Sequence, residues 1–99
     1  MIENEKYPAL SYYLRCYLNQ DFEEIFGGAK GALLSYKNTE ANEEKYGMIK
    51  EIQSLIESSY NEKELQRIIL DDIDCDYYYL NEWPSCKDWL LHILFILRS

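Results

Sequence analysis

Apolar residues recur at intervals of three and four along most of this sequence, and that spacing constrains the fold more than any other feature. In the first segment five apolar residues share one helical face, which predicts a helix from about Pro8 to Asn19. These five residues are Leu10, Tyr13, Leu14, Tyr17 and Leu18. No strand pairs, hairpin turns or internal repeats are present in the pattern. The sequence therefore predicts an all-α protein.

Capping sequences and apolar spacing predict where the other helices lie. Asp21 with Glu24, Asn61 with Glu64 and Ser85 with Asp88 stand three residues apart, as the two partners of a capping box do. Helices are expected after Asp21 as far as Gly27-Gly28, over Ala29 to Lys37, around Met48 to Ile56, from Asn61 to Ile73, and over Cys86 to Leu97. Between the last two we expect a structured loop. A chain of 99 residues has room for one domain, residues 1–99. We expect a compact single-domain bundle of five to six helices, with the nearly all-round apolar C-terminal helix at its centre.

The charge balance limits the classes of partner. The chain carries 18 acidic and 10 basic residues, which gives a formal net charge of −8. Phosphate backbones and anionic lipid surfaces repel such a protein, so direct binding to nucleic acid or to a membrane is disfavoured. A basic protein is the complementary partner, although many soluble proteins are acidic for solubility alone.

Two observations favour a cytoplasmic protein. Residues 1–7 contain two glutamates and lack the positive start and apolar stretch of an export signal. Cys16, Cys75 and Cys86 are odd in number and form no C-x-x-C pair, which favours free thiols in a reducing compartment. The longest apolar stretch, Trp89 to Leu97, is about half of the ~20 residues needed to cross a bilayer. We therefore expect no membrane segment.

No group of residues in the sequence indicates catalysis. The single histidine, His92, lies within the apolar run of the last predicted helix, where a structural role is favoured over that of a general base. No second histidine is available to form a Cys/His pair. Aspartates close to Cys75 disfavour its thiolate, the form that a nucleophile needs. We expect no catalytic residue, and a protein that is not an enzyme.

Two ligand-binding motifs are present only in part. Carboxylates at alternate positions from Asp72 resemble the start of an EF-hand loop, but Tyr77 and Trp83 occupy the required glycine and glutamate positions. A solvated acidic loop is favoured there over a single unusual cation site. The stretch Gly27 to Gly31 lacks the Gly-Lys-Ser/Thr ending of a phosphate loop. We expect no cofactor and no metal.

The segment from Asp71 to Asp88 is the strongest candidate for binding a partner, because it combines six acids and one base with several aromatic residues. Tyrosine and tryptophan are favoured interface anchors, and carboxylates around them would meet Arg or Lys of a partner. The predicted contacts are Asp71, Asp72, Asp74, Asp76, Tyr77, Tyr78, Tyr79 and Glu82. Asp21, Glu23 and Glu24 are secondary candidates, provided that the fold brings them to the same side. We also expect at least one of the three tyrosines, and Trp83, to cap the core.

Short motifs are recognisable at both ends of the chain. The N-terminal motifs are Tyr7-Pro8-Ala9-Leu10, Tyr13-Leu14, Tyr17, Asn19-Gln20-Asp21-Phe22 and Phe26-Gly27. The C-terminal motifs are Cys75-Asp76-Tyr77-Tyr78, Pro84-Ser85 and Asp88-Trp89-Leu90. Together they resemble the motifs of a family of small immunity proteins from bacterial contact-dependent growth inhibition (CDI) systems. The chain differs at Asn19, where that family often has histidine, and at Phe22, where it often has tryptophan.

The resemblance implies a function. Members of this family are helical cytosolic proteins that bind and neutralise the C-terminal toxin domain of a cognate exoprotein. Such toxins are commonly nucleases, and an RNase is favoured. An immunity protein would form a heterodimer with this basic toxin domain and occlude its active site. The alternative is an acidic regulatory or adaptor module that binds a basic host protein.

Overall fold

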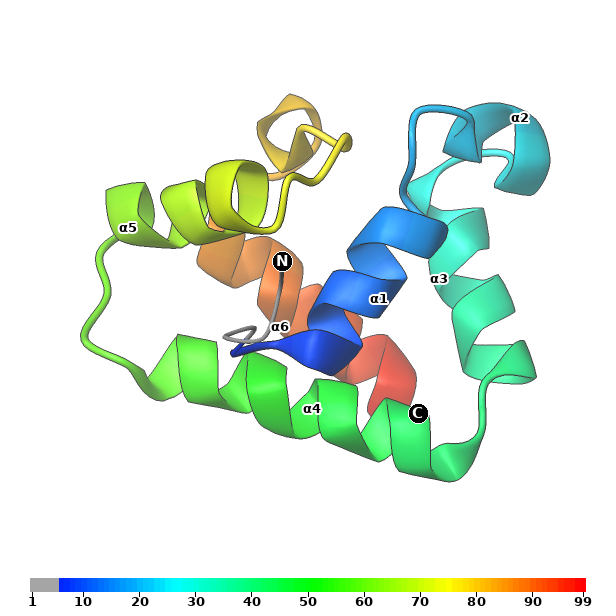
Figure 1. Ribbon diagram of the computed structural model, residues 1–99, viewed down its shortest axis with the longest axis horizontal. Helices are drawn as coiled ribbons and strands as arrows, with labels where there is room; N and C mark the ends of the chain where they lie inside the picture. Colours follow the sequence, from blue (N-terminus) through cyan, green and yellow to red (C-terminus); the bar gives the residue numbers. More distant parts are fainter. Residues whose placement is uncertain (1–5) are drawn as a thin grey trace.

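The computed structural model describes residues 6–99, and every regular element in this range is a helix (Figure 1). The all-α prediction is confirmed. Residues 1–5, on which part of the export-signal argument depends, lie outside the described range. The elements are α1 (Pro8–Cys16), α2 (Phe22–Phe26), α3 (Ala29–Thr39), α4 (Asn42–Glu57), α5 (Glu62–Gln66), the π-helix η1 (Arg67–Asp72), the 3-10 helix η2 (Tyr79–Asn81) and α6 (Cys86–Arg98).

The first helix is shorter than predicted, and the capping box predicted at Asp21 is wrong. Helix α1 ends at Cys16 rather than near Asn19. The Asn19 side chain forms the following turn, because its Oδ1 accepts from the Asp21 N–H at 3.0 Å. Asp21 has φ −102° and ψ 10°, which is not the extended conformation of an N-cap, and its carboxylate caps nothing.

The other two predicted caps are present. Asn61 and Glu64 form a complete capping box at the start of α5, with N–H to side-chain oxygen distances of 2.8 and 3.0 Å. The Ser85 hydroxyl accepts from the Asp88 N–H at the start of α6. The predicted helix from Asn61 to Ile73 changes to π-helical geometry after Gln66, and the Ile73 N–H donates to the carbonyl of Ile68.

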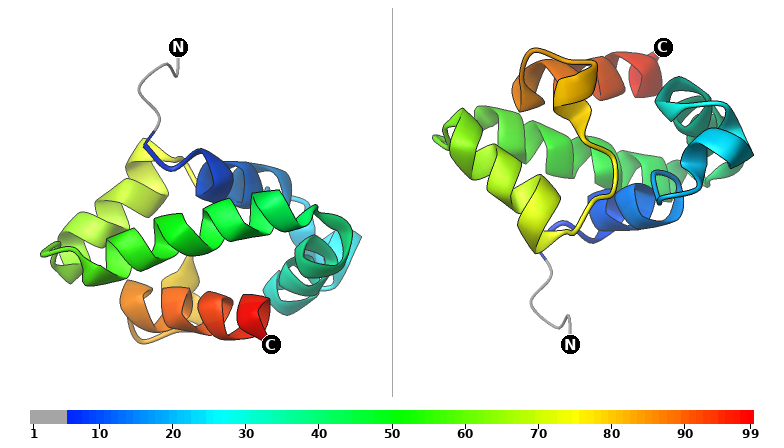
Figure 2. Two further views of the ribbon diagram at one scale, coloured as in Figure 1. Left: turned by 90° about the horizontal axis from the view of Figure 1, so that it is seen from below. Right: turned by 90° about the horizontal axis from the view of Figure 1, so that it is seen from above.

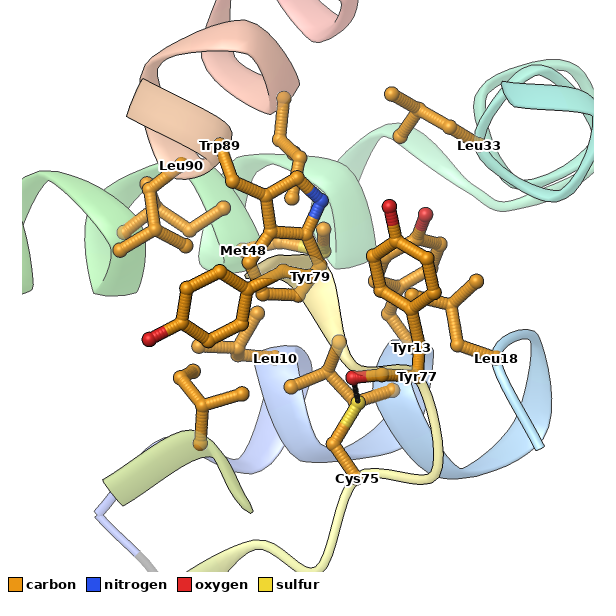
Figure 3. Close-up of a cluster of buried hydrophobic side chains, with 14 of the residues drawn as sticks. Leu10, Tyr13, Leu18, Leu33, Met48, Cys75, Tyr77, Tyr79, Trp89 and Leu90 are labelled. Carbon is orange, nitrogen blue, oxygen red and sulfur yellow. Dashed lines mark hydrogen bonds between the residues drawn. The ribbon is translucent and has the colours of Figure 1, made fainter. Parts of the chain in front are cut away.

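Helix α4 lies between α1 and α6, as the left view of Figure 2 shows. The three principal extents, 32, 31 and 29 Å, are nearly equal. One buried cluster fills the interior, and all the helices of eight or more residues contribute to it. Figure 3 shows part of this cluster, including Leu10, Tyr13, Met48, Tyr79, Trp89 and Leu90.

Helix α6 packs against α3, α4, α5 and η2. Leu90, Ile93 and Leu97 lie on its buried face. Its burial is not all-round, however. Leu91 and Phe95 are 47% and 70% exposed on the opposite face.

Carboxylates from other helices accept hydrogen bonds from N–H groups at two helix starts. Tyr7, the N-cap of α1, makes no side-chain cap, and Glu51 of α4 instead accepts from the N–H groups of Ala9 and Leu10 at 3.0 and 2.9 Å. Glu62 of α5 accepts from the Cys86 N–H at the start of α6. These bonds join helices that are far apart in sequence.

Candidate partner-binding site

The predicted partner-binding residues lie in one stretch that we call the acidic segment, Asp71 to Glu82. Side chains alternate between solvent and core along its first part. Asp72, Asp74 and Asp76 are exposed, whereas Ile73, Cys75 and Tyr77 between them are buried. Asp71, Tyr78 and Glu82 are exposed as well. The segment therefore presents a row of carboxylates on a backbone that is anchored by its own buried side chains.

Contacts with the rest of the fold fix the conformation of this row. Arg15 of α1 donates from Nε to the carbonyl of Ile73 at 3.0 Å. The Cys75 N–H donates to the Ile69 carbonyl at 3.2 Å, and the Cys75 thiol lies 3.5 Å from the Tyr77 carbonyl (Figure 3). Asp74 has φ +67°, a left-handed conformation that aspartate tolerates better than most residues. The carboxylates are thus held on an ordered backbone.

Two of the three predicted tyrosine contacts belong to the core. Tyr77 is 5% and Tyr79 0% exposed, so neither ring offers contact area to a partner that docks on this surface. The expectation that at least one tyrosine caps the core is confirmed, and Trp83 also packs partly buried against it. Tyr78, at 45% exposed, is the tyrosine of this segment that remains accessible.

Hydrogen bonds and stacking explain why the two buried tyrosines are tolerated. The Tyr77 hydroxyl donates to Glu82, and the Tyr79 hydroxyl donates to Glu62 at 2.9 Å. The Tyr79 ring stacks on Trp89, with centroids 5.3 Å apart. Burial is the main cause that raises the pKa of both phenols. Glu82 therefore supports the acidic segment from within as well as contributing a charge.

The secondary candidates lie next to the same segment. Phe22 of α2 makes an edge contact with Tyr77, with ring centroids 5.6 Å apart. Asp21, Glu23 and Glu24 around it are exposed. This ring contact brings α2 next to the acidic segment, and the three carboxylates remain secondary candidates.

The histidine and two of the cysteines pack against neighbouring side chains of the fold. The His92 ring lies 4.7 Å from that of Trp83, and burial, with a contribution from Lys30, lowers the pKa of the imidazole. Burial raises the pKa of the Cys75 thiol to about 11 and that of Cys86 to about 12, which disfavours their thiolates at neutral pH.

The structure also gives the conformation of the glycine-rich stretch. Gly27 and Gly28 form the turn between α2 and α3 with φ of +76° and +124°. Within residues 6–99 no group of three or more potential metal ligands comes together. No helix in that same range is long and apolar enough to span a membrane.

Comparison with known proteins establishes the family. The model of the CdiI immunity protein family matches residues 6–96. This chain belongs to the CdiI immunity protein family. A chain in the crystal structure of the CdiA-CT/CdiI complex from Y. kristensenii 33638 is 53% identical to it, with a TM-score of 0.91 over 94% of this chain and 99% of that one. No curated protein matches the sequence.

The motifs that carry the resemblance to the CdiI family are mainly structural in this member. Leu10, Tyr13, Leu14 and Tyr17 are buried in the core, as are Trp89 and Leu90. The sequence reading missed Arg15, which holds the acidic segment to α1. It also missed the alternation of apolar and acidic residues from Asp72 to Tyr77, a period of two that indicates one buried and one exposed side.

Proposed function

We propose that this CdiI family member binds and neutralises the C-terminal toxin domain, CdiA-CT, of a cognate CDI exoprotein. The observation that carries the proposal is the 53% identity and TM-score of 0.91 to a chain of a CdiA-CT/CdiI complex. The inhibitor acts in the cytoplasm as one half of a heterodimer, without a cofactor and without catalysis. An acidic adaptor for a basic host protein is the alternative, and no observation favours it over the toxin.

The negative charge of this chain supports a nuclease as the toxin, and within that class we propose an RNase. A nuclease must present cationic groups where it binds phosphates, and the net charge of −8 on this chain complements such a surface. Electrostatic steering can raise association rates to ~10⁸ M⁻¹s⁻¹ or more at low salt, against ~10⁵ to 10⁶ for a neutral pair. A fast inhibitor protects the cell because each free toxin molecule is active until it is bound.

The acidic segment is the part of the chain that we assign to the toxin's active site. Asp71, Asp72, Asp74 and Asp76 would contact cationic groups directly, with Tyr78 as the accessible aromatic residue. Tyr77, Tyr79 and Glu82 would act mainly by supporting the segment from beneath. Because the segment is ordered, little conformational entropy would be lost when it docks.

Co-purification with the toxin domain, followed by an RNase assay and a growth-protection assay, tests the proposal. We expect a 1:1 complex, loss of RNase activity at one equivalent of inhibitor, and survival of cells that express both proteins. His92→Gln should protect as well as the parent, since no catalytic step is involved. The proposal would be wrong if the two proteins formed no complex, or if protection needed His92 in a protein that still bound the toxin.

A further inference from the structure

The charge of this protein is distributed unevenly between its helices. Helices α3 and α6 carry four basic residues and one acidic residue, so their side chains sum to +3. Since the whole chain has a net charge of −8, the remainder carries −11. The four basic residues are Lys30, Lys37, Lys87 and Arg98, and the acidic one is Asp88.

Two of these cations lie where α3 and α6 contact each other. The Lys37 ammonium donates to the Ser99 hydroxyl at 3.0 Å, which joins the C-terminal ends of the two helices. Lys30, near the start of α3, lies close enough to His92 of α6 to contribute to the lowered pKa of that imidazole. Lys87 and Arg98 stand at the two ends of α6. Lys87 is four residues before Leu91 and Arg98 is three residues after Phe95, a spacing that puts them on the same face of the helix.

Two exposed apolar side chains lie on α6 between Lys87 and Arg98. Leu91 and Phe95 of α6, four residues apart, are 47% and 70% exposed. With Leu94, Arg98 and Ser99 they line an open groove of about 420 Å³. We call this surface, Leu91 and Phe95 with Lys30, Lys37, Lys87 and Arg98, the basic face. An apolar centre with a charged rim is the usual anatomy of a protein interface.

Charge complementarity decides what can cover the basic face. A basic toxin surface is repelled by it, and a symmetric dimer through two basic faces brings like charges together. The acidic segment has the opposite charge and includes an exposed aromatic residue, Tyr78, that could enter the groove. We infer that the basic face binds the acidic segment of a second copy of this chain.

One copy does not make this contact with itself. Its acidic segment packs on α6 through the buried rings of Tyr77 and Tyr79, whose centroids lie 5.4 and 5.3 Å from that of Trp89. Leu91 and Phe95 nevertheless stay exposed. A contact between the acidic segment and the basic face therefore needs a second copy. We take the contact to be heterologous, so that each copy offers its basic face to one neighbour and its acidic segment to another, and one free surface of each kind remains at the ends of every dimer.

Self-association has a consequence that rests on the proposed function. If the toxin covers the acidic segment, it competes with the second copy for the same carboxylates. Toxin binding would then release monomers from the self-associated form. Failure of the proposed function would leave self-association itself unaffected.

Sedimentation of the free protein from about 10 µM to 1 mM in 0.15 M salt, where the Debye length is ~8 Å, tests the inference. The mean mass should rise with concentration above the 11.9 kDa of one chain. Phe95→Ser and, separately, Asp72→Asn with Asp76→Asn should each weaken association at least about tenfold, as loss of an interface anchor does. Tyr46→Ser removes an aromatic ring that is 64% exposed outside the basic face and should change nothing.

Mixing the two weakened proteins is the decisive arm. The Phe95→Ser protein keeps only its acidic segment and the double aspartate variant keeps only its basic face, so the mixture should form 1:1 dimers that grow no further. Arg98→Glu, with Lys63→Glu as its control, repeats the test without altering the apolar centre. A parent that stays monomeric at 1 mM, either variant that associates normally alone, or a mixture that stays monomeric would overturn the inference.

Discussion

Single carboxylates stabilise this fold by joining parts of the chain that are far apart in sequence. Glu51, Glu62 and Glu40 each accept hydrogen bonds from residues at least 17 positions away in sequence. Glu40 takes the hydroxyls of Tyr12 and Tyr17 at 2.9 and 2.6 Å. These carboxylates contribute to the net charge of −8 but serve the interior of the molecule rather than its partners.

Replacing Glu51 with alanine should destabilise the protein by about 1 to 2 kcal/mol, the usual cost of losing an N-cap. The N–H groups of Ala9 and Leu10 would lose their acceptor, and α1 has no side-chain cap of its own to replace it. Glu57→Ala, an exposed position on the same helix, is the control and should change the free energy of unfolding by less than about 0.5 kcal/mol. Urea denaturation measures both. Equal stability of the two variants would show that Glu51 is no cap.

At the scale of elements, much of the fold could be predicted because apolar spacing and capping pairs are local signals. The helices at Asn61 and Ser85 begin where their sequences predict. The π-helix η1 could not be predicted, because it depends on how Ile69 and Ile73 reach a core built by other helices. The capping box at Asp21 did not form because the Asp21 N–H, from which Glu24 would have to accept a hydrogen bond, donates to the Asn19 side chain instead.

The candidate site was predictable in charge but not in geometry. The aspartates of the acidic segment are exposed as their charge requires. Which of three consecutive tyrosines would be buried depends on the position of Trp89 and Glu62, which lie in other elements. Arg15 acts through a backbone carbonyl 58 residues away, and no sequence spacing indicates such a bond.

Two glycines should respond in opposite directions to the same substitution. A Cβ at Gly31 would lie 1.9 Å from the carbonyl oxygen of Phe26, so Gly31→Ala must displace α2 from α3. We expect a loss of about 1 to 3 kcal/mol, typical of overpacking. A Cβ at Gly47 meets nothing closer than 3.6 Å, so Gly47→Ala should stabilise α4 by about 0.5 to 1 kcal/mol. Thermal unfolding of the two variants measures both effects. A Gly31→Ala protein that is more stable than the parent would contradict the packing of α2 on α3.

For the molecule as a whole, the many buried phenols and thiols predict sensitivity to alkali. Burial raises the folded-state pKa of Tyr13, Tyr36 and Tyr79 above the usual 10, and those of Cys75 and Cys86 from 9 to about 11 and about 12. A raised folded pKa stabilises the protein fully below the unfolded pKa, and the stability is lost as pH rises toward the folded value. Each such group then costs about 1.4 kcal/mol per pH unit.

Urea denaturation between pH 7 and pH 11 measures this effect. Stability should be nearly constant up to about pH 8.5 and fall steeply above pH 9. Cys86→Ala, whatever its effect at pH 7, should reduce the slope above pH 9 because one titrating group is removed. A constant free energy of unfolding up to pH 11 would show that these side chains are accessible to water.

The separation of charge across the molecule, with the acidic segment on one side and the basic face on another, is the feature that links fold to function. The acidic segment is proposed to supply the attraction for a cationic toxin. Its contribution can be removed without disturbing the core, because Asp72 and Asp76 are exposed and asparagine keeps their shape. Glu43→Gln with Glu57→Gln removes two exposed charges from α4 and serves as the matched control.

The rate of association with the toxin domain, measured at about 0.05 M and 0.5 M salt, tests the central claim most directly. The parent should bind much faster at low salt, since screening weakens steering. The Asp72→Asn, Asp76→Asn protein should bind more slowly at low salt and lose part of its salt dependence, whereas the Glu43→Gln, Glu57→Gln control should stay close to the parent. If the aspartate variant matches the parent in rate and affinity at both salt concentrations, the toxin docks elsewhere and the acidic segment is only a solvated surface.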